Sequence, residues 1–226
     1  MPRRVCARSR LRRVAGGLGA TAGAVRVRAG GFFVAVALGA SGVGCASVPL
    51  PSPAVVAEAR ATVTYSGSLR VSLSGPQFRG RTRVLVGFRR PDAIRIEIPG
   101  PTGPRLVAVT KDGALTAVFP GDRAIFQGRA TAAELESLLG VSLAPEELID
   151  LLVGVPSPRL RSYEARWSRA LPRQITAVLP DGTRLRARVD EAETGLDLQA
   201  EAFQAPRHEA FRAVDAAEAR RLWGGR

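Results

Sequence analysis

Apolar and polar residues alternate along much of the chain from residue 63 onward, which predicts strands that are buried on one face. In residues 63–73 the apolar side chains occupy one face, and residues 78–88 repeat the pattern with arginines on the other face. Shorter strands are predicted at 93–98, 105–110, 114–119 and 123–127, separated by turn sequences rich in Pro, Asp and Gly. Because these connections are too short for parallel crossovers, the strands are predicted to form an antiparallel meander.

Between residues 131 and 154 the apolar residues recur with the spacing of an α-helix. Thr131 and Glu134 have the spacing of a capping box, and Gly140 suits the left-handed position after a helix. Pro145 is predicted to begin a second helix, which Gly154 follows. The apolar faces consist of Leu135, Leu138 and Leu139 in the first helix, and of Leu148, Leu151 and Leu152 in the second. The pattern therefore predicts a helical hairpin inserted in a β protein.

Further strands are predicted at 159–168, 172–180, 183–190 and 195–203, followed by a short helix that carries Leu222 and Trp223. An open meander of about ten strands would expose two faces and two edges, so such sheets usually curl. The predicted fold class is mainly β: a strongly curved antiparallel sheet capped by the helical hairpin. The space between them is either a packed core, which apolar faces more often indicate, or an apolar pocket.

The N-terminal segment has the layout of a secretory signal. Residues 29–57 carry no charge, follow Arg26 and Arg28, and include the apolar run 31–40. The small residues that end in Gly44 and Cys45 resemble a bacterial lipoprotein signal, in which cleavage precedes an acylated cysteine. We therefore predict a signal peptide at 1–44, an acylated Cys45 with a Pro-rich tether at 45–60, and a folded domain at 61–226.

Three alternatives to lipid attachment at Cys45 remain open. The apolar run could be an uncleaved anchor, although its glycines and Pro49 make a poor spanning helix. Ordinary signal peptidase could instead cut after Gly42 or Gly44, or Cys45 could be a chance small residue. The positively charged region is long for a signal, which suggests that translation starts near Val25.

Most of the excess positive charge lies in the N-terminal region. The chain has a formal charge of +13, but its first 30 residues hold eight arginines and no acid, which leaves 25 bases and 20 acids in the remainder. That balance is mild for a nucleic-acid-binding domain, so no nucleic-acid partner is predicted. The arginines at 79, 81 and 83 and at 184, 186 and 188 are predicted to lie on a solvated sheet face, with contact to lipid headgroups as the alternative.

Nothing in the sequence predicts an enzyme. Two cysteines and one histidine, His208, exclude a disulfide framework and a clustered metal site, so no metal or cofactor is predicted. His208 has no nearby nucleophile, and the aspartates at 112, 122 and 181 have turn spacing. The glutamates at 134, 146 and 147 fall in the first turns of helices, where the helix dipole stabilises them.

The order of elements resembles that of the LolA/LolB lipoprotein-localisation family. The resemblance spans most of residues 60–200 and is most specific in GPTGPRLVAVT (100–110), DRAIFQG (122–128) and TAAELESLLGVSLAPEELIDLLVGVP (131–156). Within the family these features are closer to the outer-membrane lipoprotein LolB. The resemblance implies a half-barrel of about eleven strands with a helical lid, whose cavity holds the acyl chains of a lipoprotein in transit.

The resemblance also implies candidate site residues and partners. The candidate acyl-cavity lining is Leu69, Val71, Val84, Val86, Ile94, Ile96 and Trp167, and the candidate lid is Leu135, Leu139, Leu148 and Leu152. The implied partners are membrane lipid through acylated Cys45, lipoprotein acyl chains and a periplasmic carrier protein, at the periplasmic face of the outer membrane. The alternative function is an envelope scaffold or accessory lipoprotein that binds a protein and no lipid.

One loop departs from the LolB pattern. LolB-like proteins carry an exposed leucine before a glycine in a protruding loop that engages the membrane. The matching loop here contains Pro101, Thr102 and Gly103, so threonine stands where that leucine would be. The candidate membrane-facing loop is therefore present without its apolar residue.

Overall fold

The computed structural model describes residues 51–76, 78–207 and 209–224. The predicted signal peptide 1–44, Cys45 and His208 lie outside the described residues. Ala46–Arg226 form one compact unit, and this unit contains the whole described core.

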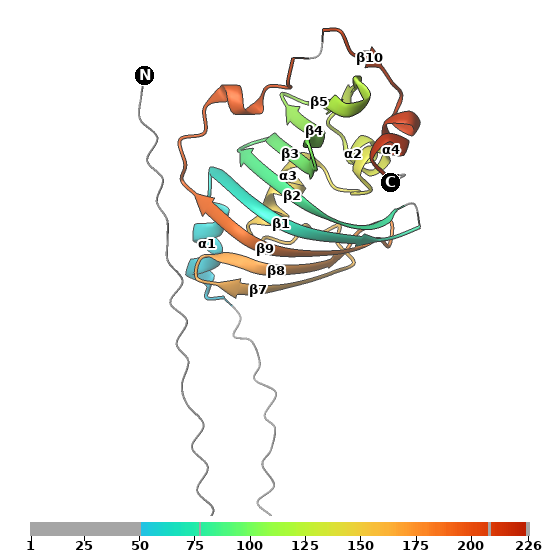
Figure 1. Cartoon of the computed structure of the whole chain (residues 1–226). Coiled ribbons are helices and arrows are strands. Elements are labelled where there is room, and N and C mark those ends of the chain that lie inside the picture. The colour runs from blue at the N-terminus through green and yellow to red at the C-terminus, as the bar shows by residue number, and fades with distance from the viewer. Residues whose placement is uncertain (1–50, 77, 208, 225–226) are drawn as a thin grey trace, which may run out of the picture. The chain divides into compact units, whose positions relative to one another are not determined.

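Ten strands form one sheet in the described part of the chain (Figure 1), so the predicted mainly β class is confirmed. They are β1 (Thr64–Ser74), β2 (Arg79–Arg89), β3 (Ala93–Gly100), β4 (Gly103–Lys111), β5 (Ala114–Phe119), β6 (Ala124–Arg129), β7 (Ser162–Ser168), β8 (Leu171–Val178), β9 (Arg184–Thr194) and β10 (Arg212–Ala213). The order across the sheet is β10-β6-β5-β4-β3-β2-β1-β9-β8-β7, so β1 lies between β2 and β9. Two antiparallel meanders, β1–β6 and β7–β9, are thus joined through β1.

The helices are α1 (Pro53–Arg60), α2 (Ala132–Leu139), α3 (Pro145–Leu152) and α4 (Ala216–Gly224), with short 3₁₀ turns η1 (Pro120–Asp122) and η2 (Ala200–Phe203). The Thr131 hydroxyl accepts a hydrogen bond from the Glu134 amide, and Gly140 ends α2 with a φ of 72°. Pro145 begins α3, as its position predicts. The two predicted helices are therefore confirmed, with bounds close to those in the sequence pattern. No helix in the described ranges is long and apolar enough to span a membrane.

The predicted tether is partly helical. Helix α1 occupies Pro53–Arg60, its N-cap Ser52 accepts a hydrogen bond from the Val55 amide, and Ala59 is buried in the core. Serine followed by proline is the sequence signal of an N-cap and a first helical position. Half of the segment 45–60 therefore belongs to the folded domain.

The predicted strand at 195–203 is wrong. Gly195, with a φ of 73°, ends β9, and the chain then turns into η2. Leu198 and Phe203 of this segment pack on Ala93, Val107 and Val109, which lie on the sheet face away from α2 and α3. The apolar residues that suggested a strand instead cover the outer face of β3 and β4.

The expectation of a wholly antiparallel sheet also needs correction. Strand β10 pairs with β6 in parallel, and the Arg212 amide donates to the carbonyl oxygen of Arg123. A parallel pair needs a long connection, and the chain between β9 and β10 supplies one through η2. Two residues with little apolar character gave no sequence signal for this strand.

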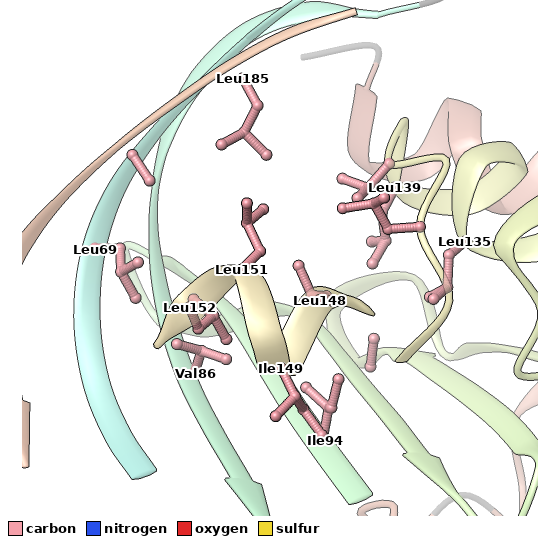
Figure 2. Packing of buried hydrophobic residues seen from close by; sticks show 14 of the residues in the cluster. Leu69, Val86, Ile94, Leu135, Leu139, Leu148, Ile149, Leu151, Leu152 and Leu185 are labelled. Atoms are coloured by element: carbon pink, nitrogen blue, oxygen red, sulfur yellow. The ribbon is translucent and has the colours of Figure 1, made fainter. Parts of the chain in front are cut away.

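The main core lies between the inner face of the sheet and the helices (Figure 2). On the inner face, Leu69, Val86 and Ile94 point toward the leucines of α3. Helix α4 packs beside α2, where the Trp223 indole N–H donates to the Leu138 carbonyl oxygen at 2.6 Å. This bond satisfies one of the carbonyls that the end of a helix leaves without an internal partner.

Candidate functional site

An apolar pocket lies between the inner sheet face and the helical hairpin. The sheet contributes Leu69, Val71 and Leu73 from β1; Gly80, Thr82, Val84 and Val86 from β2; Ile96 and Ile98 from β3; Ile175 from β8; and Leu185 and Ala187 from β9. The other lining residues are Phe78, Leu139, Val141, Leu148, Leu151, Leu152 and Trp223. Thr82 is the one hydroxyl-bearing residue in this lining, so the pocket favours apolar ligands.

One row of inward-facing side chains that lines the pocket is small. In the sheet register Val71 lies opposite Thr82 on one side and Ala187 on the other. The neighbouring row, Val84, Leu69 and Val189, is bulkier.

The pocket has a volume of about 100 Å³. A water molecule takes roughly 30 Å³ in the liquid, and a cavity of about 150 Å³ lined by leucine and similar residues stays dry and binds benzene. The present space therefore matches a few methylene groups and is too small for a whole acyl chain. Only part of a longer chain fits this space unless the helices or the β1–β2 hairpin move.

The structure brings most of the predicted lining residues to this pocket. Leu69, Val71, Val84, Val86 and Ile96 all line it, whereas Ile94 and Trp167 do not. Ile94 is fully buried in the core near Ile149 (Figure 2). Trp167 lies against Gly154 at the end of α3, where a Cβ on Gly154 would be 2.4 Å from the indole ring. Trp167 thus packs against the C-terminal end of α3, outside the pocket lining.

Three of the four predicted lid residues, Leu139, Leu148 and Leu152, line the pocket. Leu135 is buried elsewhere in the core, one helical turn from Leu139. Sequence reasoning missed Leu151, although its position on the same apolar face as Leu148 could have found it. It also missed Phe78 and Trp223, whose rings stack with centroids 4.6 Å apart at the pocket.

The C-terminal helix closes one side of the pocket by binding α2. The Arg220 guanidinium donates to the carbonyl oxygens of Ser137 and Glu136. Trp223 adds the bond to Leu138, and the Arg105 guanidinium donates to the Trp223 carbonyl oxygen at 3.1 Å. Stacking of Phe78 on Trp223 connects this corner to the β1–β2 hairpin.

Polar contacts also fasten the helical hairpin to the sheet. The Arg90 guanidinium lies 2.8 Å from an Asp150 carboxylate oxygen of α3. The Ser142 hydroxyl, between α2 and α3, donates to Asp181 in the β8–β9 turn at 3.2 Å. Any opening of the pocket by α3 has to break or bend around these two contacts.

Asp181 gives this attachment a pH dependence. Burial acts to raise its pKa, but hydrogen bonds from Thr183 and Ser142 outweigh burial, so the pKa lies below the ordinary value. A carboxyl with a lowered folded-state pKa stabilises the fold above its unfolded pKa of about 3.9, and this contribution disappears as pH falls through the folded value.

We therefore expect Asp181→Asn to lower the melting temperature at neutral pH. The difference in melting temperature between this variant and the wild type, the gap, should narrow below about pH 4. Thermal unfolding of both proteins across this pH range measures the gap. A gap that stays constant down to the lowest pH would contradict the proposed role of the Asp181 carboxylate.

The candidate membrane-facing residues Pro101, Thr102 and Gly103 are all exposed at the turn between β3 and β4. Two buried hydroxyls, those of Tyr65 and Tyr163, have no hydrogen-bond partner among the described residues, and neither tyrosine lines the pocket. Burial raises the pKa of Tyr65 to about 12 and also raises that of Tyr163, so both stay neutral at physiological pH. No group of three or more metal-ligating residues occurs in the described part.

The fold and pocket define a mainly β protein with an apolar site between a sheet and a helical hairpin. No family model matches the chain, and no curated protein matches it. Among solved structures it is similar to a LolA superfamily protein from Nitrosomonas europaea, with 10% identity over 70% of this chain and 99% of that one, at a TM-score of 0.41.

Two further solved structures are similar. A putative outer membrane lipoprotein-sorting protein domain from Vibrio parahaemolyticus has 8% identity, covers 66% of this chain and 94% of its own, and gives a TM-score of 0.40. MucB has 17% identity, covers 69% of this chain and 62% of its own, and gives a TM-score of 0.36.

Proposed function

We propose that this protein binds lipid acyl chains in the apolar pocket and takes part in lipoprotein localisation or insertion as an outer-membrane lipoprotein of the LolB type. The observation that carries the proposal is the pocket itself, an unfilled apolar space in an otherwise packed core. A space of this kind has no role in a purely structural core, because each cavity lowers stability.

In this proposal the sheet is a strongly curved half-barrel around the ligand. Its support is that five strands, β1, β2, β3, β8 and β9, contribute side chains to one small pocket together with α2, α3 and α4. The pocket is the closed form, and acyl entry moves the α2–α3 hairpin outward. Leu139, Leu148 and Leu152 are the lid side chains that then lie along the chain.

Lipid attachment at Cys45 would hold the domain at the periplasmic face of the outer membrane. Growth with a fatty-acid analogue labels the protein if Cys45 is acylated, and Cys45→Ala removes the label and leaves a longer precursor. Absence of label on the wild-type protein would exclude the anchor without affecting the pocket. Because Thr102 stands in the β3–β4 turn in place of the leucine of LolB-like proteins, we assign no membrane insertion to this loop.

The experiment for the pocket is mass spectrometry of lipids extracted from the purified Ala46–Arg226 unit. We expect acyl lipid near a one-to-one ratio, or, if the site is emptied during purification, saturable binding of a fluorescent fatty acid. If neither lipid nor fatty-acid binding is found, the acyl-binding proposal is wrong.

A second candidate function is an envelope scaffold or accessory lipoprotein whose pocket stays closed. The small volume of about 100 Å³ and the contacts Arg90–Asp150 and Ser142–Asp181 favour it. In that case the same protein would bind no fatty acid, and its exposed faces would carry the function.

A further inference from the structure

Seven exposed arginines lie on the outer face of three adjacent strands, β2, β1 and β9. Paired residues in an antiparallel sheet lie on the same face, and the register arranges this face in three rows. Across β2, β1 and β9 the rows are Arg83, Arg70 and Arg188; Arg81, Ser72 and Arg186; and Arg79, Ser74 and Arg184. All seven arginines are exposed, and we call this set the arginine face.

Little negative charge compensates the arginine face. Asp190 forms an ion pair with Arg70 at 2.6 Å, and Arg83 donates to the Ser68 hydroxyl at 3.0 Å. Arg188 also interacts electrostatically with Asp190. The other four arginines make no side-chain hydrogen bond or ion pair with any described residue: Arg79, Arg81, Arg184 and Arg186. Because like charges placed opposite one another destabilise a sheet, this arrangement lowers the stability of the folded chain.

The geometry of the face suits phosphate groups. Neighbouring strands lie about 4.8 Å apart, so the arginine columns of β2 and β9 stand roughly 10 Å apart on either side of β1. The short side chains of Ser72 and Ser74 form the floor between these columns. A hollow of about 340 Å³ runs beside Ser72, Arg81 and Arg186. A phosphate over Ser72 would lie between two guanidinium groups, each able to bind it through paired N–H donors.

The rest of the outer face is different. Segment 196–204 covers β3 and β4, and Glu191 and Glu193 extend the face of β9 beyond Asp190 with acidic residues. Positive charge is thus concentrated in one uncovered area.

We propose that the arginine face binds the anionic headgroups of a phospholipid membrane. Charge complementarity supports this partner, since each arginine near an anionic bilayer strengthens association, and the attraction acts only over about a Debye length. Under the proposed anchor at Cys45, Pro53 is eight residues away, so α1 starts within about 30 Å of the bilayer. This inference concerns the outer face and does not depend on acyl binding in the pocket.

The test is cosedimentation of the Ala46–Arg226 unit with vesicles of phosphatidylcholine alone or mixed with phosphatidylglycerol. We expect binding that requires phosphatidylglycerol and weakens at high salt. The double variant Arg81→Gln/Arg186→Gln should lower the partition coefficient about 30-fold, the factor expected for two arginines at an anionic surface. Fluorescent fatty-acid binding should not change, because both residues face away from the pocket.

The matched control is Arg60→Gln/Arg129→Gln, which removes the same net charge from α1 and β6. Arg60 and Arg129 are exposed and make no side-chain hydrogen bond or ion pair with any described residue. We expect this variant to bind vesicles like the parent. Equal loss in both variants, vesicle binding that does not depend on phosphatidylglycerol, or binding of a single-stranded oligonucleotide in place of vesicles would each overturn the proposal.

Discussion

Ala187→Leu is expected to raise the stability of the domain and to weaken acyl-chain binding at least tenfold. Ala187 lies in the small row of inward-facing residues and contributes to the pocket wall. The three added carbons would occupy space that an acyl chain otherwise fills. Each methylene of the acyl chain that is no longer buried there lowers its binding free energy by about 0.8 kcal/mol. Filling a cavity commonly stabilises a protein by about 0.5 to 2 kcal/mol. Thermal unfolding and fluorescent fatty-acid titration on the same sample measure both effects.

The control for this variant is Ala165→Leu on β7. Ala165 is half buried and lies outside the pocket, so the same atoms are added without occupying the site. We expect its fatty-acid affinity to match that of the parent. If Ala187→Leu binds fatty acid as tightly as the parent, the acyl chain does not enter this pocket.

Trp223→Ala is expected to destabilise the domain by about 3 to 5 kcal/mol, the usual cost of truncating a buried tryptophan. The variant loses the ring stack on Phe78 and the hydrogen bond to the Leu138 carbonyl, and it enlarges the pocket. For a domain of this size the melting temperature should fall by roughly 6 to 20 °C. Differential scanning calorimetry gives the change directly.

Trp223→Phe separates the two contributions of this residue. It keeps an aromatic ring against Phe78 but removes the indole N–H, and the net loss of one hydrogen bond is about 1 kcal/mol. If Trp223→Ala lowers the free energy of unfolding no more than Trp223→Phe does, α4 does not support the pocket wall.

The alternating strands and the helical hairpin could be predicted because each gives a local periodicity of apolar residues in the sequence. Thr131, Gly140 and Pro145 sit at the helix ends that the sequence indicates. Five of seven proposed lining residues reach the pocket for the same reason, since positions two apart on a strand share a face. Lining residues that were missed, such as Leu73 on β1 and Ala187 on β9, follow that rule too.

Other features depend on contacts between distant segments, which no local period records. Ile94 has the pattern of a lining residue, but α3 packs directly over it and leaves no space there. Trp223 reaches the pocket only because Arg220 and its own indole bind the end of α2. The strand predicted at 195–203 was wrong because Leu198 and Phe203 are buried against the outer face and not within the ladder.

The arginine face shows how the fold changes the meaning of a sequence pattern. As two separate rows in the sequence, the arginines at 79, 81 and 83 and at 184, 186 and 188 indicate ordinary solvated residues. The sheet order places β1 between them and adds Arg70. Two unremarkable rows thereby become one concentrated positive area.

The most direct test of acyl binding is photo-crosslinking with a fatty acid that carries a diazirine on its chain, followed by peptide mapping of the Ala46–Arg226 unit. Our account predicts modification of residues that line the pocket, above all Leu69, Leu151 and Ala187, and competition by unlabelled fatty acid. Crosslinks confined to exposed residues, or unaffected by the competitor, would contradict it.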